Sequence, residues 1–117
     1  MKHRLDELFD TIQGKKTANP KISYTAKLLK SGTGTIAQKV GEEAVETIIE
    51  AVSGRQKQLV NESVDLLYHL MVLWVDRDIK LQNVWDEIDR RASKSGIEEK
   101  ANRVEKIEKG KIDSNDL

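Results

Sequence analysis

Two pairs of acidic residues, each separated by three positions, lie in consecutive stretches of the chain. Glu43 and Glu46 form the first pair, and Glu62 and Asp65 form the second. Residues three or four apart lie on one face of a helix, so each pair presents two carboxylates in one direction. If the two helices face each other, four carboxylates converge on a hard cation. Mg²⁺ or Mn²⁺ would suit such an all-oxygen site, and Mg²⁺ held in this way usually serves phosphate chemistry.

The second pair is the more informative one, because its surroundings are apolar. Residues 59–75 carry hydrophobic side chains on almost every side of a helix, which predicts a buried helix. A buried carboxylate without a partner is costly unless it takes up a proton. No lysine or arginine lies between Lys57 and Arg77 to balance these acids. A metal ion would resolve this conflict, whereas the alternative, a solvated acidic helix face, stays open at this point.

Other side chains near the acidic pairs could take part in the same chemistry. Glu42 could be a further metal ligand, or it could act with Glu43 in catalysis by orienting the attacking water as a base. Lys39 lies one turn before Glu43, where it either binds a phosphate or pairs with Glu43 or Glu42. Lys27 is a further cation for phosphate binding. His69, one turn beyond the second pair, is grouped with the substrate side of the site, where it donates to a carboxylate and orients it. A satisfied core histidine fits His69 equally well.

Hydrophobic spacing predicts helices nearly everywhere and no strand, so the expected fold class is all-α. The expected helices are 5–12, 23–30, 35–53, 56–75 and 81–92. Glycines after the first three helices are typical stop signals. The two long helices are expected to form a central hairpin within a helical bundle. Residues 1–96 then form the domain, and the charged segment 97–117 is expected to be a marginal helix or a disordered tail.

Composition narrows the class of protein. A chain of 117 residues is expected to form a single domain with its own core. Twenty basic residues balance twenty acidic ones, which argues against a nucleic-acid binder. The absence of cysteine excludes disulfides and thiolate metal sites and fits a cytoplasmic setting. No apolar run approaches the roughly 20 residues that a membrane-spanning helix needs.

The two acidic pairs also carry a family resemblance. The text EAVE (residues 43–46), fifteen further residues and ESVD (residues 62–65) resemble the signature of the all-α nucleoside triphosphate pyrophosphohydrolases, the MazG-like superfamily. More narrowly, SYTAKLL, QKVGEEAVE, ESVDLLYHLMVLW and VWDEIDRR resemble the phosphoribosyl-ATP pyrophosphohydrolase family in the same order, over about residues 5–91. This resemblance implies hydrolysis of phosphoribosyl-ATP to phosphoribosyl-AMP and pyrophosphate, the second step of histidine biosynthesis.

The resemblance also implies details of the site and of the assembly. It implies Mg²⁺, for which Mn²⁺ could substitute, and a homodimer whose helices complete a shared four-helix bundle. It assigns Tyr24, within the SYT text, to stacking on adenine or to closing the pocket. The chain departs from the family at Thr35, where a lysine is common, and this departure puts a phosphate contact at that position in question.

Two alternatives remain at the level of sequence. A house-cleaning pyrophosphohydrolase of the same fold, acting on dCTP, dUTP or modified nucleotides, would need the same metal site. A non-catalytic helical dimerisation module would carry its acids on a solvated face.

Overall fold

The computed structural model describes residues 2–93, and the regular secondary structure in this range is helical throughout. The helices are α1 (Arg4–Gly14), α2 (Tyr24–Ser31), α3 (Thr33–Val52), α4 (Gln56–Asp76) and α5 (Leu81–Ser93). The all-α prediction is therefore confirmed, and every expected helix is present. The predicted 97–117 extension lies outside the described residues. The chain divides into two compact units after Leu81, so α5 beyond its first residue belongs to the second unit.

Local signals explain where the helices begin and end. The Ser23 hydroxyl caps α2 by accepting from the Ala26 N–H at 3.1 Å, which satisfies a backbone donor that the first turn leaves free. Gly32 precedes α3 with φ of 95°, a backbone conformation that favours glycine. Because Gly32 can adopt this conformation directly after α2, α3 begins at Thr33, two residues before the predicted start.

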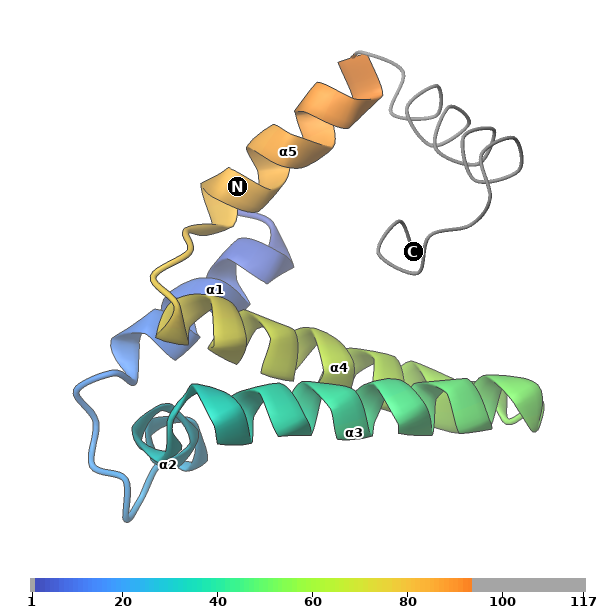
Figure 1. Ribbon diagram of the computed structural model, residues 1–117, viewed down its shortest axis with the longest axis horizontal. Helices are drawn as coiled ribbons and strands as arrows, with labels where there is room; N and C mark the ends of the chain where they lie inside the picture. The colour runs from blue at the N-terminus through green and yellow to red at the C-terminus, as the bar shows by residue number, and fades with distance from the viewer. Residues whose placement is uncertain (1, 94–117) are drawn as a thin grey trace, which may run out of the picture. The chain divides into compact units, whose positions relative to one another are not determined.

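The two long helices form an antiparallel hairpin that carries the rest of the first unit. Figure 1 shows α3 and α4 side by side, with α1 beside α4 and with α2 at the end where α3 begins. The buried apolar side chains of this unit include Phe9, Ile12, Ala26, Leu28, Ile36, Met71, Val72 and Val75. The core therefore lies where α1 and α2 cover the first half of α3 and the second half of α4.

Neither α1 nor α2 covers the half of the hairpin near the turn between α3 and α4. On α4, Val60, Val64 and Leu67 are 63%, 56% and 42% exposed. The predicted burial of α4 on almost every side is therefore wrong for its first half within one chain, because α1 and α2 do not extend that far. Apolar side chains of α3 are exposed in the same half of the hairpin, namely Val45, Ile48, Ile49 and Val52.

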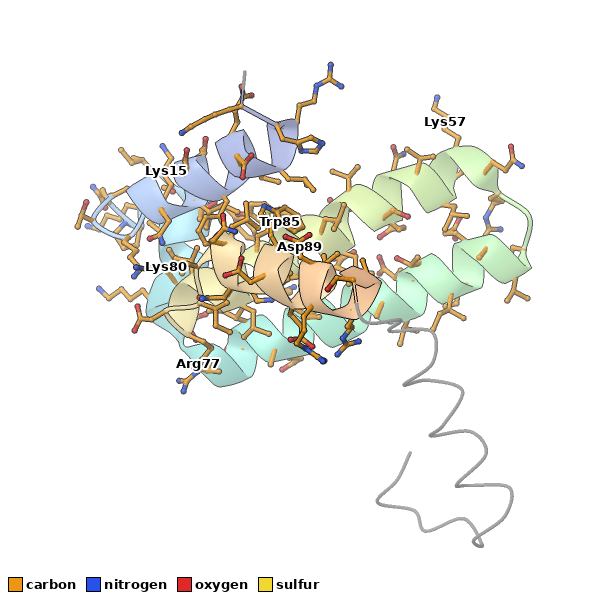
Figure 2. All side chains as sticks on the ribbon, turned by 90° about the horizontal axis from the view of Figure 1, so that it is seen from above. Lys15, Lys57, Arg77, Lys80, Trp85 and Asp89 are labelled. Atoms are coloured by element: carbon orange, nitrogen blue, oxygen red, sulfur yellow. The ribbon has the colours of Figure 1, made fainter. Side chains whose placement is uncertain are left out.

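The turn that joins the two long helices is fixed by one ion pair and one glycine. The Arg55 guanidinium donates to both Glu50 carboxylate oxygens, at 2.7 and 2.8 Å. Gly54, between the helices, has φ of 74°. Lys57, just after this turn, points away from the pair of helices (Figure 2). Among the described helices, none combines the length and apolar character needed to cross a membrane.

Candidate functional site

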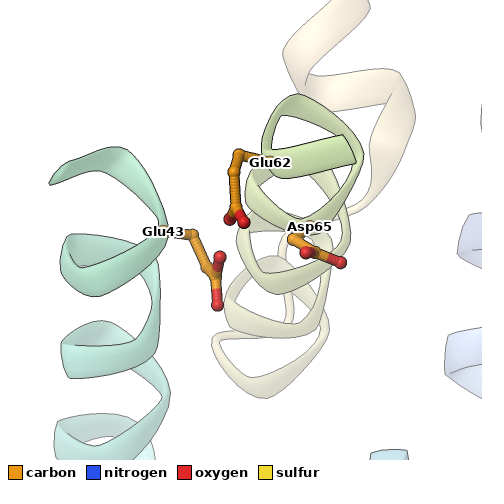
Figure 3. Close-up of side chains that lie close together, drawn as sticks. All are labelled: Glu43, Glu62 and Asp65. Atoms are coloured by element: carbon orange, nitrogen blue, oxygen red, sulfur yellow. The ribbon is translucent and has the colours of Figure 1, made fainter. Parts of the chain in front are cut away.

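Three carboxylates from the two long helices converge between them. One oxygen each from Glu43 on α3 and from Glu62 and Asp65 on α4 lie within 4.8 Å of one another. The side chains of Glu43 and Glu62 point toward each other across the hairpin (Figure 3). Such spacing suits oxygen ligands around one hard cation. The structure therefore brings together three of the four predicted metal ligands in a group that could hold a metal ion.

The fourth predicted ligand, Glu46, lies outside this group but next to it. The Glu62 carboxyl, which faces it across the hairpin, raises the pKa of Glu46 above its usual value. The neighbouring Glu43 carboxyl likewise raises the pKa of Glu62. Carboxylates that crowd together without a cation disfavour one another's charged form. Glu46 therefore belongs to the same electrostatic cluster as the three converging carboxylates.

Two oxygens of this cluster lack a partner, and neither lysine of the two long helices reaches them. Glu43 Oε2 and Glu62 Oε2 are buried and have no hydrogen-bond partner. The one lysine of α3, Lys39, lies 3.4 Å from a Glu42 oxygen, which confirms the predicted intrahelical pair and shows that its partner is Glu42. The one lysine of α4, Lys57, points away from the hairpin (Figure 2). A buried carboxylate oxygen without a donor is costly, and a cation from outside the chain would remove that cost.

Glu42 differs from its acidic neighbours because it already has partners. The Gln38 amide donates to Glu42 Oε1 at 3.1 Å, and Lys39 lies beside the other oxygen. The Gln38 hydrogen bond, followed by the charge of Lys39, lowers the pKa of Glu42. Glu42 is therefore held ionised at the edge of the cluster, and it is not one of the three converging ligands.

His69 is buried, but its hydrogen bond differs from the predicted one. Its Nδ1 donates to the backbone carbonyl of Asp65 at 2.8 Å, whereas we expected donation to a carboxylate. The four-residue spacing places the ring over the carbonyl of the preceding turn, which competes with the side-chain oxygens. Nε2 is buried without a partner. The alternative of a core histidine is therefore met in burial and at Nδ1, whereas Nε2 has no partner.

An aromatic group lies beside His69. The rings of Tyr24 and Tyr68 stack with centroids 6.5 Å apart and planes 22° apart, and His69 meets both rings edge-on. The Tyr68 hydroxyl is hydrogen-bonded to the Thr25 hydroxyl. Tyr24 is 56% exposed, so part of its ring faces solvent while Tyr68 supports it. Tyr68 could not be predicted as part of this group, since a tyrosine in an apolar helix carries no signal beyond core packing.

A cavity of about 280 Å³ lies in the angle between α2 and α3. Its lining residues are Tyr24, Lys27, Leu28, Ser31, Thr35 and Lys39. The structure thus gathers the three residues predicted to bind substrate from these helices, Tyr24, Lys27 and Lys39. It also places Thr35, the position of the family departure, in the wall of the same cavity.

Comparisons with known proteins show what this chain is similar to over most of its length. The sequence profile described as phosphoribosyl-ATP pyrophosphohydrolase matches residues 5–92. A phosphoribosyl-ATP pyrophosphatase of Azospirillum brasilense is 56% identical over 96 residues, covering 82% of this chain and 86% of the relative. One from Paramagnetospirillum magneticum is 51% identical over 102 residues, covering 87% and 94% of the two chains. One from Gluconobacter oxydans is 50% identical over 99 residues, covering 85% and 74%.

Proposed function

The chain belongs to the phosphoribosyl-ATP pyrophosphohydrolase family, and we propose that it hydrolyses phosphoribosyl-ATP to phosphoribosyl-AMP and pyrophosphate in histidine biosynthesis. The observation that carries this proposal is the cluster of converging carboxylates whose buried oxygens have no partner. A stable helix pair gains nothing from such a cluster by itself, since like charges repel. A hydrolase that acts on a polyphosphate substrate can use such a carboxylate cluster as its metal-binding site.

We propose that Glu43, Glu62 and Asp65, with Glu46 beside them, hold Mg²⁺. The donor set fits this ion, because it consists of hard carboxylate oxygens and contains two buried oxygens that lack donors. Mn²⁺ could replace Mg²⁺ in such a site. When bound, the ion supplies neutralisation of the phosphate charge that the acidic cluster would otherwise repel.

Glu42 and Lys39 would carry out complementary tasks in the reaction. Water attacks the phosphorus nearest the nucleoside. A new P–O bond forms there, the bond to the oxygen that bridges to the next phosphorus breaks, and pyrophosphate leaves with the bonding electrons. Glu42, ionised and outside the group of three ligands, orients the water and accepts its proton. Lys39, beside Glu42, donates to a phosphate oxygen of the bound substrate.

We also propose that two chains associate through the uncovered half of the hairpin. Seven apolar side chains of α3 and α4 are exposed there, and exposed apolar patches of this kind mark interfaces. A second hairpin packed against them would complete a four-helix bundle. We expect Val64→Asp to convert a dimer into a monomer, as measured by light scattering after size-exclusion chromatography. Ile22→Asp, at an apolar residue that is 85% exposed outside the hairpin, is the matched control. A wild-type monomer would contradict the proposal.

We place the reaction in the cytoplasm and expect neither a membrane nor a nucleic acid among its partners. The lack of cysteine and the balance of twenty basic with twenty acidic residues support this setting.

The decisive experiment measures pyrophosphate release with Mg²⁺ from phosphoribosyl-ATP, beside ATP, dCTP and dUTP. We expect rapid release from phosphoribosyl-ATP and its loss on chelation. Preference for dCTP or dUTP would instead identify a house-cleaning enzyme with the same site. No release from any substrate would favour a dimerisation module.

A further inference from the structure

The cavity between α2 and α3 is lined on α3 by Thr35 and Lys39, which precede the acidic residues along the same helix. Lys39 belongs to both regions, because it pairs with Glu42 and also lines the cavity. Thr35, also in the cavity wall, is eight residues before Glu43 on the same helix. That separation corresponds to about 12 Å along the helix axis. A ligand held at the carboxylates could therefore extend along α3 into this cavity.

The chemistry of the cavity favours an anionic group with hydroxyls. Two lysines, two hydroxyl side chains and one tyrosine line it, and no acidic residue does. Lys39 already has an acidic neighbour in Glu42. Lys27 differs, because no ion pair or hydrogen bond engages its ammonium group within residues 2–93. An ammonium group without a counter-charge in an acid-free pocket is suited to bind a phosphate.

The size of the cavity restricts what it can hold. At about 280 Å³ it lies just below the roughly 300–1,000 Å³ of sites that enclose a whole drug-sized ligand. It can therefore take one end of a nucleotide substrate but not all of it. Phosphoribosyl-ATP has two anionic ends, the triphosphate and the 5-phosphate of the ribosyl group on adenine. The hydrolysed end must lie at the carboxylates, so the other end is left for the cavity.

We propose that Lys27 binds the 5-phosphate of this ribosyl group and thereby selects phosphoribosyl-ATP over ATP, an inference that rests on the proposed function. Tyr24 lies three residues before Lys27, on the same face of α2. Its partly exposed ring, supported by Tyr68, offers a stacking surface for the adenine between the two anionic ends. The hydroxyls of Ser31 and Thr35 lie where the ribose would enter.

The same helix supplies a matched control. Lys30 is three residues beyond Lys27, but it lines a different cavity together with Lys16 and Asp76. Both lysines are exposed and carry the same charge on α2. Replacing either one alters the net charge equally, and only Lys27 lies in the cavity next to the carboxylates.

The test compares two ligands that differ by the whole 5-phosphoribosyl group on adenine, so the role of Lys27 is measured by how each variant changes the ratio of their affinities. Binding of phosphoribosyl-AMP and of AMP to the full chain with Mg²⁺ is measured by calorimetry. We expect wild type to bind phosphoribosyl-AMP more tightly. Lys27→Ala should lower that affinity about 10- to 100-fold, the usual value of a charge-assisted hydrogen bond, and leave AMP binding unchanged. Lys30→Ala should change neither, and Lys27→Arg should retain most of the preference because it retains the charge.

Several outcomes would overturn the inference. One is equal affinity of wild type for the two ligands. Another is a Lys27→Ala variant that weakens both ligands equally or weakens neither. Inorganic pyrophosphate is measured in the same way, and a loss of affinity in Lys27→Ala that is confined to pyrophosphate would instead assign Lys27 to the leaving group. Because binding is measured without turnover, a chain that fails to hydrolyse phosphoribosyl-ATP contradicts the proposed function, and the affinity ratio still tests the role of Lys27.

Discussion

Two acidic regions of this chain have opposite surroundings. On α5, Glu87 accepts hydrogen bonds from Arg90 at 2.7 and 3.0 Å and from Arg91 at 3.0 Å. The two arginines, Arg90 first, lower the pKa of Glu87 to about 2. In the hairpin, Glu46 and Glu62 face other carboxylates, and their pKa values are raised. On α5, a glutamate is thus paired with arginines of its own helix. In the hairpin, glutamates lie next to other carboxylates and repel one another.

The difference shows which acids are available for chemistry. An acid that its neighbours already neutralise contributes to surface charge and helix stability, and offers little to a ligand. Acids that converge without a cation hold a charge imbalance that an external ion can relieve. The local density of acidic residues does not distinguish paired acids from unpaired ones, because α3 and α5 are both rich in charge. The separation depends on whether a cation lies within reach on the same helix or across the hairpin.

The largest expected effect is on turnover after Glu62→Gln. This change keeps the shape of the side chain and removes one charge from the group of converging ligands. We expect pyrophosphate release to fall at least about 100-fold, because loss of even an indirect metal contact costs 10- to 100-fold. Glu87→Gln is the matched control and should retain wild-type activity. Equal activity of the two variants would show that the acids of the hairpin matter no more for turnover than Glu87 on α5.

The next effect is on thermal stability with Mg²⁺. An ion that binds only the folded chain raises the unfolding temperature, by about 8–16 °C for a chain of this length at one hundred times its dissociation constant. We expect this rise in wild type and in Glu87→Gln, measured by calorimetry, and its loss in Glu62→Gln. A rise of the same size in all three proteins would place the ion elsewhere.

A smaller effect distinguishes the two regions by pH. Because the pKa values of Glu46 and Glu62 are raised, the folded chain binds protons that the unfolded chain releases. The free energy of unfolding of the metal-free protein should therefore fall as pH rises from the ordinary glutamate pKa through these raised values. The pH dependence that Glu87 adds has the opposite sign. Its contribution to the free energy of unfolding is present above the ordinary glutamate pKa and is lost as pH falls toward about 2.

Urea unfolding of metal-free protein at a series of pH values measures this dependence. We expect the decline above the ordinary glutamate pKa to be weaker in Glu62→Gln than in wild type, and weaker in wild type once Mg²⁺ is added. Parallel curves for wild type and Glu62→Gln would contradict the assignment of the decline to the hairpin.

The smallest effect is on stability after Glu87→Gln. Glu87 and its arginines lie on the helix surface, where ion pairs contribute little. We expect an unfolding temperature close to that of wild type at neutral pH, and closer still in high salt, because salt screens such pairs. A large loss of stability would show that the pair does more than satisfy a surface charge.

The sequence by itself determined the helices and the faces that they present. Periodicity identified all five helices and, with glycine stop signals after the first three, located their ends to within about two residues. The spacing of Glu62 and Asp65, in a helix with a single lysine, was sufficient to expect an unbalanced acidic site. These features depend on the helical repeat, which is a property of local sequence.

Only the tertiary structure decided which side chains meet between helices. Glu43 joins Glu62 and Asp65, while Glu46 lies beside them, because the packing of α3 on α4 sets the distance at each level of the hairpin. The pairing of Lys39 with Glu42, the carbonyl partner of His69 and the exposure of Val64 could not be read from a helical repeat. Lys27 and Thr35 share a cavity because α2 meets α3 at an angle, and a repeat along one helix carries no information about that angle.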